Sequence, residues 1–330
     1  MNGKLRYIWA KNREAIFGYV IMIAVAILYI SSQKKFFTAY GIKSAFDQFM
    51  TLLFGALAQT LVILTGGIDL SVGALIGLTN SVTAFIMVPI AGALGNDTLG
   101  IAATILIVLL IGAVCGCING MLIVYGRLQP IIVTLATSFI FMGIGMYILP
   151  QPSGEVVSGF TKLMMGTITP LKIPKSVLWL LFSIFLLWIP IRRSKFGQSI
   201  YAIGGNENAA FVSGIHVKKT KVKTYLMAGV CCAMAGILLT AQTTVGDPTG
   251  SDGFTMNSVA AVVLGGTALS GGRGSFIGTV AGVITYSLIL GLLIFWGVNS
   301  FYQDMIKGLI LVAALAINAL QKIKLRRKPA

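Results

Sequence analysis

Long apolar runs alternate with short polar segments along almost the whole chain. A helix needs about 20 apolar residues to cross the ~30 Å hydrocarbon core of a bilayer. The pattern therefore predicts an all-α membrane protein, a polytopic bundle of about ten transmembrane helices. Two of the runs, 176–191 and 255–270, are short for a full crossing. The runs lie at about 15–30, 46–65, 70–91, 99–124, 131–149, 176–191, 224–243, 255–270, 274–296 and 301–320.

Two glycine pairs interrupt this apolar pattern in similar contexts. Gly66-Gly67 begins the string Gly-Gly-Ile-Asp-Leu-Ser-Val-Gly, and Gly265-Gly266 begins Gly-Gly-Thr-Ala-Leu-Ser-Gly-Gly. A glycine pair interrupts the hydrogen bonds of a helix, and lipid offers no donors or acceptors to the backbone groups that are left unpaired. We therefore predict broken helices at both pairs and a parallel internal repeat, offset by six spans. Broken helices at corresponding positions of two halves indicate a solute pathway.

The candidates for a translocation path are the glycines of the two breaks and the polar residues within or beside the flanking spans. Uncharged hydrogen-bonding side chains suit a neutral, polyhydroxylated solute that must pass without tight binding. Taken singly, each of the polar side chains is better explained by a hydrogen bond between helices, so the prediction concerns the group and not any one member. The candidates are Gln59, Thr65, Gly66, Gly67, Asp69, Ser71, Asn80, Asn257, Gly265, Gly266 and Ser270.

Asp69 is the acidic residue closest to a span interior, and an ionisable group within the membrane is a functional hypothesis by default. Its position just after the first break also allows it to cap the helix that follows Gly67. A proton relay is a third possibility. The sequence leaves these three interpretations open.

Composition supports a single transmembrane domain over residues 1–330. The chain is 56% hydrophobic and 10% charged, whereas about a quarter of the residues in a soluble domain are charged. Its nine acidic residues and single histidine are too few for metal clusters or paired catalytic carboxylates, so we do not expect an enzyme. The four cysteines lie inside apolar runs at spacings that do not face each other on a helix, which favours a packing role.

The net charge of +16 is best explained by membrane topology. In a soluble protein it would suggest nucleic acid, but here the basic residues flank the apolar runs. With the N-terminus inside, eighteen basic residues fall on the cytoplasmic side and six on the outer side. The excess of positive charge inside predicts that both termini are cytoplasmic. Membrane lipid is an expected partner, and nucleic acid is not.

Residues 192–223 form the longest polar stretch, and they are predicted to be a cytoplasmic loop. Within this loop, 206–213 is predicted to form a short helix. Asn206 is a suitable N-cap, Glu207 meets the positive end of the helix dipole, and Gly214 suits the left-handed position after the helix. So short a helix needs outside support. It suits a docking element, although an ordinary loop that contains one helical stretch would look the same.

Several segments resemble the ribose-type permeases of ABC importers. They are Gly-Gly-Ile-Asp-Leu-Ser-Val-Gly at 66–73, Tyr-Ala-Ile-Gly-Gly-Asn at 201–206 and Ala-Ala-Val-Val-Leu-Gly-Gly-Thr at 260–267, with Ala209-Ala210 and Ser213-Gly214-Ile215. The likeness covers about residues 36–314. It departs at Met142-Gly143, where many relatives carry Arg-Gly, which weakens the inference to ribose itself.

The resemblance implies a membrane subunit that works with a second permease copy, as a homodimer or with a paralogue. It also implies a cytoplasmic ABC ATPase, which would bind ATP and Mg in place of this chain, and a periplasmic or lipid-anchored sugar-binding protein. On that basis 206–213 looks like the coupling helix that seats in the ATPase. The coupling residues would be Gly204, Gly205, Asn206, Glu207, Ala209, Ala210 and Gly214.

The resulting hypothesis is the permease subunit of an ATP-binding-cassette importer for a small neutral sugar, of the pentose or hexose class, in the bacterial inner membrane. The chain has no Gly-x-x-x-x-Gly-Lys-Ser/Thr string, so the ATP would be bound by a partner. One alternative keeps the architecture and imports an autoinducer, a nucleoside or a branched-chain amino acid. Another is a stand-alone secondary transporter or channel, which the scarcity of ionisable residues within the spans disfavours.

Overall fold

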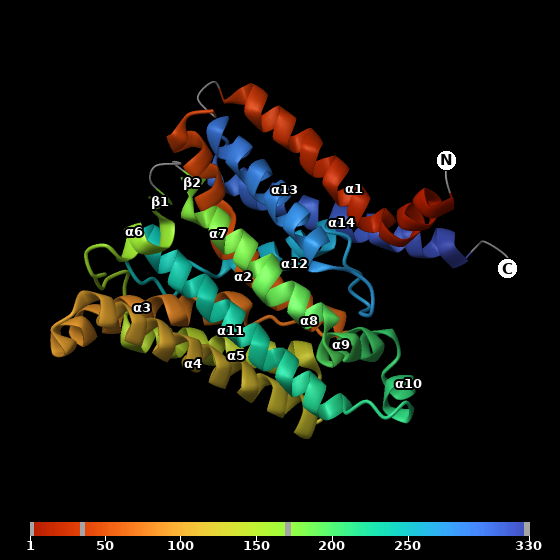
Figure 1. Ribbon diagram of the computed structural model, residues 1–330, viewed down its shortest axis with the longest axis horizontal. Helices are drawn as coiled ribbons and strands as arrows, with labels where there is room; N and C mark the ends of the chain where they lie inside the picture. Colours follow the sequence, from red (N-terminus) through yellow and green to blue (C-terminus); the bar gives the residue numbers. More distant parts are fainter. Residues whose placement is uncertain (1–2, 34–36, 169–172, 327–330) are drawn as a thin grey trace.

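The structure is a computed structural model that describes residues 3–33, 37–168 and 173–326, and it is almost entirely helical (Figure 1). One short hairpin is the only sheet in these ranges. The elements are α1 (Gly3–Ser32), α2 (Ala39–Leu64), α3 (Val72–Leu94), α4 (Asp97–Tyr125), α5 (Pro130–Ile148), α6 (Phe160–Met165), β1 (Thr167–Ile168), β2 (Ile173–Pro174), α7 (Lys175–Leu181), the π-helical turn η1 (Phe182–Trp188), α8 (Ile189–Arg193), α9 (Lys195–Gly205), α10 (Glu207–Val212), α11 (Val217–Thr243), α12 (Gly253–Leu264), α13 (Phe276–Phe295) and α14 (Ser300–Arg326).

The predicted all-α, polytopic membrane architecture is confirmed. Seven helices of the described chain are long and apolar enough to cross a membrane: α2, α3, α4, α5, the continuous α7–η1–α8 segment, α11 and α13. Each of the ten predicted runs contains helix. The run at 255–270 differs from the expectation, because α12 ends at Leu264 and has only 12 residues. At 1.5 Å per residue it is about 18 Å long, so it covers roughly half of a bilayer core.

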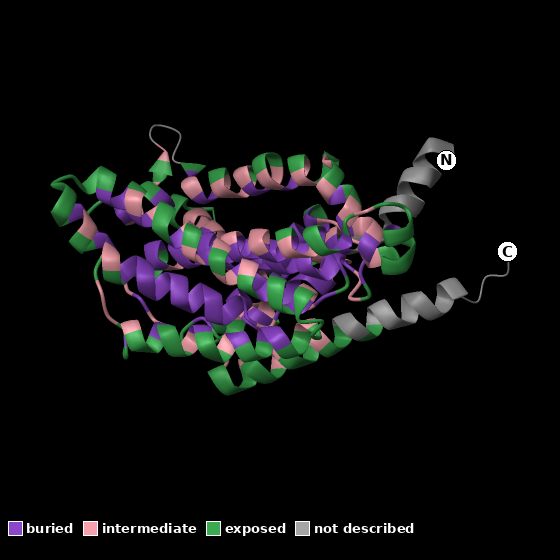
Figure 2. Cartoon of the chain, turned by 90° about the horizontal axis from the view of Figure 1, so that it is seen from below, coloured by how far each residue is buried: buried purple, intermediate pink, exposed green. Residues whose placement is uncertain are grey.

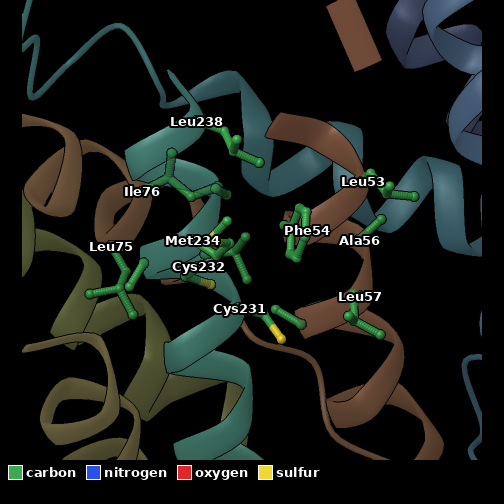
Figure 3. Packing of buried hydrophobic residues seen from close by; sticks show 14 of the residues in the cluster. Leu53, Phe54, Ala56, Leu57, Leu75, Ile76, Cys231, Cys232, Met234 and Leu238 are labelled. Carbon is green, nitrogen blue, oxygen red and sulfur yellow. The ribbon is translucent and has the colours of Figure 1, made fainter. Parts of the chain in front are cut away.

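Helix α2 lies at the centre of the bundle and is buried along most of its length. It packs against α3, α11, α12 and α13. Figure 3 shows Phe54 of α2 facing Cys231 and Met234 of α11 within the buried apolar cluster. The burial colouring in Figure 2 shows the same layering, with a buried interior enclosed by helices that are exposed on their outer faces.

Small residues bring α4 and α11 into close contact. Gly116 of α4 faces the backbone of Tyr225 and Gly229 in α11, and a Cβ added to Gly116 would overlap the Tyr225 carbonyl oxygen. Glycine faces of this kind let helix backbones approach each other in lipid, where the hydrophobic effect gives no preference for protein over acyl chains. The two helices therefore form one of the tightest pairs in the fold, visible side by side in Figure 1.

The bundle has two distinct ends. The hairpin end carries β1, β2 and α6, and the α10 end carries α9 and α10, at opposite corners of Figure 1. Helices α2 and α12 both terminate at the α10 end, since the amide of Gly272, just after the second break, donates to the carbonyl of Leu64 at 3.0 Å. The two broken helices therefore run in the same direction, as a parallel repeat requires.

The two breaks have the same hydrogen-bonded geometry. After α2, Gly66 adopts φ 84° and its amide donates to the carbonyl of Ile63 at 2.8 Å. After α12, Gly266 adopts φ 82° and its amide donates to the carbonyl of Val263 at 3.0 Å. These are Schellman caps, whose left-handed residue is usually glycine. The structure thus pairs Gly66 with Gly266, one residue later than the sequence repeat, which aligned Gly66 with Gly265.

Candidate functional site

Three glycine-containing segments meet at the α10 end, and we call this contact the glycine junction. It consists of Leu64–Gly66 after α2, Gly204–Gly205 at the end of α9, and Gly271–Gly272 after α12. A Cβ on Gly204 would overlap the carbonyl oxygen of Leu64 and the amide nitrogen of Gly272. A Cβ on Gly271 would lie 2.8 Å from the nitrogen of Gly66. The three backbones are therefore in direct contact, and only residues without side chains fit between them.

Helix α10 follows the junction and has the caps that its sequence predicts. The Asn206 side chain accepts a hydrogen bond from the amide of Ala209 at 3.0 Å, which is an N-cap contact. At the other end, Gly214 has φ 81° and the amide of Ile215 donates to the carbonyl of Ala210 at 3.1 Å. A helix therefore occupies the stretch that the sequence identified.

Packing holds α10 in a fixed position. Ala210 is buried against Ile203 of α9 and Val217 of α11, and these three side chains form a small core of their own. On the outer side, Lys221 of α11 donates to a carboxylate oxygen of Glu207 at 2.6 Å. The Glu207 end of that ion pair is open to solvent, so the pair contributes little stability. The buried apolar contact is therefore the main attachment of α10.

The outer face of α10 presents two large apolar side chains to solvent. Phe211 is 71% exposed and Val212 is 85% exposed. Among the residues proposed for coupling, Ala209 is also exposed, but Ala210 faces inward. The sequence interpretation missed Phe211 and Val212. Large apolar residues in a polar loop, beside a small one that is buried, are the signal that could have revealed this face.

A polar cavity of about 470 Å³ lies beside the junction, between α10, the first break and α11. The hydroxyl of Tyr225 borders this cavity and has no hydrogen-bond partner among the described residues, although its ring is buried. Most of the predicted coupling residues and the first break therefore line this one cavity. The lining residues are Thr65, Gly66, Gly67, Ile123, Pro130, Ile203, Gly204, Gly205, Asn206, Glu207, Asn208, Lys221, Tyr225 and Ser270.

Asp69 lies in the turn that leads into α3. One of its carboxylate oxygens accepts hydrogen bonds from the amide and the hydroxyl of Ser71, at 2.8 and 2.6 Å. Asn119 of α4 in turn donates to the Ser71 hydroxyl at 2.9 Å. These contacts fix the turn that precedes α3, whose N-cap residue is Ser71, and the functional role of Asp69 stays a prediction.

Asn80 lies far from the breaks and organises the hairpin end. Its amide nitrogen donates to Thr240 at 2.9 Å and to the carbonyl of Val245 at 3.1 Å. Its amide oxygen accepts from the backbone of Asp247 at 2.6 Å. The hydrogen bonds of this side chain thus connect α3 to the last turn of α11 and to the segment that follows it.

The remaining path candidates lie at separate places. Gln59 is fully buried, and neither amide atom has a partner among the described residues. Asn257 of α12 accepts a hydrogen bond from the Tyr286 hydroxyl at 2.5 Å and is partly exposed. Gly265 packs on α13, where an added Cβ would lie 2.5 Å from the Gly278 carbonyl oxygen. The structure does not bring all the candidates into one channel within a single chain, and their role in translocation stays a prediction.

Residues 41–315 match the family described as branched-chain amino acid transport system / permease component. The chain is 33% identical over 316 residues to the ribose import permease protein RbsC of Escherichia coli (strain K12), covering 94% of each. It is 37% identical over 303 residues to RbsC of Bacillus subtilis (strain 168), covering 91% of this chain and 90% of that protein.

A third relative is named for a different sugar. The chain is 33% identical over 317 residues to the galactose/methyl galactoside import permease protein MglC of Escherichia coli (strain K12). The match covers 92% of this chain and 93% of that protein. No solved structure is significantly similar to this chain.

Proposed function

Because this chain belongs to the family of branched-chain amino acid transport system permease components, of the ribose type, we propose that it is the transmembrane subunit of a bacterial importer for a small neutral sugar. It is a multi-pass, non-catalytic ABC permease of the bacterial inner membrane. The observation that carries the sugar assignment is the similarity to three permeases named for ribose or galactose, which extends over at least nine tenths of each chain.

The proposed partners are a cytoplasmic ATPase that binds ATP and Mg, a sugar-binding protein on the opposite side, and a second permease copy. The distribution of charge supports an orientation with the α10 end in the cytoplasm. Among the described residues outside α1 and α14, the basic side chains of that end are Arg127, Arg192, Arg193, Lys195, Lys218, Lys219, Lys221, Lys223 and Arg273, against Lys43, Lys162 and Lys175 toward the hairpin end.

Helix α10 is the proposed contact with the ATPase. Its Phe211 and Val212 are the exposed apolar pair, whereas Ala210 holds the helix to α9 and α11. Large apolar side chains that project from a rigid support suit insertion into a groove of a partner. The glycine junction then connects α9 directly to both helix breaks, so a push on α10 reaches the ends of α2 and α12 without passing through flexible side chains.

Replacing both Phe211 and Val212 by Ala tests this contact. Interface hot spots are worth about 2 kcal/mol or more, so recovery of the ATPase with the purified permease should fall at least ~30-fold, and sugar uptake should fall with it. The Lys219→Ala variant, at an exposed position near the start of α11, is the matched control and should retain both. Normal recovery of the ATPase with the double variant would remove α10 from the interface.

Uptake by cells that express the complete importer tests the cargo. We expect accumulation of a labelled pentose or hexose and none of leucine. The family description favours one alternative, a branched-chain amino acid, and leucine uptake without sugar uptake would support it. The chain alone in liposomes should transport neither, because the proposed motor is a separate subunit. Transport by the chain alone would instead indicate a secondary transporter or channel.

A further inference from the structure

The segment between α11 and α12 leaves the hairpin end and descends along α3. It begins beside Asn80, whose side chain accepts a hydrogen bond from the amide of Asp247. It continues to Gly73, whose carbonyl accepts from the Ser251 hydroxyl at 2.8 Å and whose amide donates to the Thr255 hydroxyl at 2.8 Å. From Asn80 to Gly73 the segment moves about 10 Å toward the α10 end, at 1.5 Å per helical residue.

Close backbone packing fixes this descent. A Cβ on Gly77 would overlap the carbonyl oxygen of Pro248 and the hydroxyl of Ser251. A Cβ on Gly73 would lie 2.6 Å from the Thr255 hydroxyl. The glycines of α3 therefore form the groove that holds the segment. Irregular backbone at membrane depth occurs only where protein buries it or where it borders water.

The neighbouring pair of α3 and α4 shows how deep the segment reaches. Ser71 of α3 bonds to Asn119 of α4, and Gly100 of α4 packs on Ala91 of α3, so the two helices run antiparallel. By this register Gly73 and Gly77 lie level with about residues 113–117 of α4. That level is roughly 25 Å from the first residue of α4 and 16 Å from its last. The start of α12 is therefore deep within the membrane.

The two sides of the bundle differ in chemistry at this depth. On α4, Val114 is 57% exposed and apolar, as a lipid-facing residue should be. On α12, Asp252 at the first turn is exposed, and its carboxylate has no hydrogen bond or ion pair with any described residue. Within α12, Met256 is exposed and Asn257 is partly exposed. Ionisable residues at membrane depth face water-filled cavities or the bundle interior, not lipid.

Resting on the proposed function, we propose that the exposed face of the first turns of α12, formed by Asp252, Met256 and Asn257, lines the solute path. The Asp252 carboxylate accepts hydrogen bonds from sugar hydroxyls as the sugar passes, while Met256 contacts its apolar carbon face. A fixed negative charge at this point also disfavours anionic solutes such as sugar acids. The residue thus contributes to the preference for neutral cargo.

Thiol labelling tests the location independently of the cargo. In the complete importer, with the four native cysteines replaced by Ala, single Asp252→Cys and Val114→Cys variants are compared in membrane vesicles of both orientations. The reagent is a charged methanethiosulfonate that does not cross lipid. Asp252→Cys should react at least ~10-fold faster than the depth-matched Val114→Cys in one orientation. Equal rates, or no reaction at position 252, would overturn the proposal.

Uptake tests the role of the carboxylate. Asp252→Leu should lower sugar uptake at least ~10-fold while the ATPase still co-purifies, and Asp252→Asn should retain part of the uptake and admit a sugar acid. Uptake by Asp252→Leu at the rate of the unsubstituted importer would refute the contact with sugar. If the unsubstituted importer takes up no sugar although position 252 reacts, the proposed cargo is wrong and the location of the path stands.

Discussion

At the scale of single residues, the buried polar groups of α2 and α3 differ in how they are satisfied. Asp69 and Asn80 are hydrogen-bonded, and each fixes a nearby turn or segment. Thr60 of α2 bonds to Thr279 of α13 at 2.9 Å. Gln59, one position earlier, has no partner for either amide atom among the described residues. A buried and unpaired amide lowers stability, so Gln59 is a candidate for a role other than folding.

Replacing Gln59 by Leu tests this distinction. An unpaired buried polar group costs about 1–3 kcal/mol, so Gln59→Leu should leave the thermal unfolding midpoint of the purified importer unchanged or raise it, while sugar uptake falls. The neighbouring Thr60→Val variant, which breaks a satisfied hydrogen bond, should lower the midpoint. If both variants lower it equally, the Gln59 amide has a structural partner in the assembled importer.

At the scale of elements, the glycine junction joins three segments that are far apart in the sequence. Helices α2 and α12 end in matching caps, and the end of α9 lies between the chain segments that follow them. Contact between backbones has no rotamers that could absorb a displacement. We therefore expect a movement of α9 with α10 to shift the ends of both broken helices together.

Two adjacent glycines allow a matched test of the junction. A Cβ at Gly204 would overlap the Leu64 carbonyl, whereas a Cβ at Gly205 would meet nothing within 4 Å. Gly204→Ala should therefore destabilise the importer by roughly 1–3 kcal/mol, as overpacking does, and should impair uptake. Gly205→Ala should have little effect on either. Thermal unfolding and uptake measure the outcome, and equal behaviour of the two variants would contradict the close contact.

At the scale of the whole molecule, the two ends differ in charge and in shape. The α10 end carries most of the described basic residues and the exposed helix α10, and the hairpin end carries the short sheet and the entry to the segment before α12. Lys and Arg are retained on the cytoplasmic side when a chain inserts into the membrane, so this asymmetry predicts the orientation of the protein. The proposed ATPase contact at α10 and the hairpin end lie at opposite ends of the bundle.

Cysteine accessibility in intact cells checks the orientation. In the background without native cysteines, Asp97→Cys at the start of α4 should react with an impermeant thiol reagent added outside. Ser213→Cys, at the end of α10, should react only after lysis. Both positions are exposed in the structure, so burial does not explain a difference. Labelling of position 213 from outside would reverse the topology.

The sequence by itself determined the features that depend on local chemistry. Run lengths predicted the helices because a span must match the bilayer thickness. Glycine pairs located both breaks, and Asn206 with Gly214 located α10, because caps act over a few neighbouring residues. Hydropathy was a less reliable guide to where a helix ends. The apolar run 255–270 continues past the end of α12 at Leu264, since an apolar loop and an apolar helix have the same hydropathy.

Only the tertiary structure decided which surfaces meet. It paired Gly66 with Gly266, turned Ala210 inward and Phe211 outward, and joined Ser251, next to Asp252, to Gly73 of α3. Lipid tails and protein interior are equally apolar, so hydropathy cannot tell a lipid-facing side chain from a packed one. The position of a residue along the bundle and the direction of its side chain depend on contacts between segments far apart in the chain. Those contacts exist only once the helices have packed.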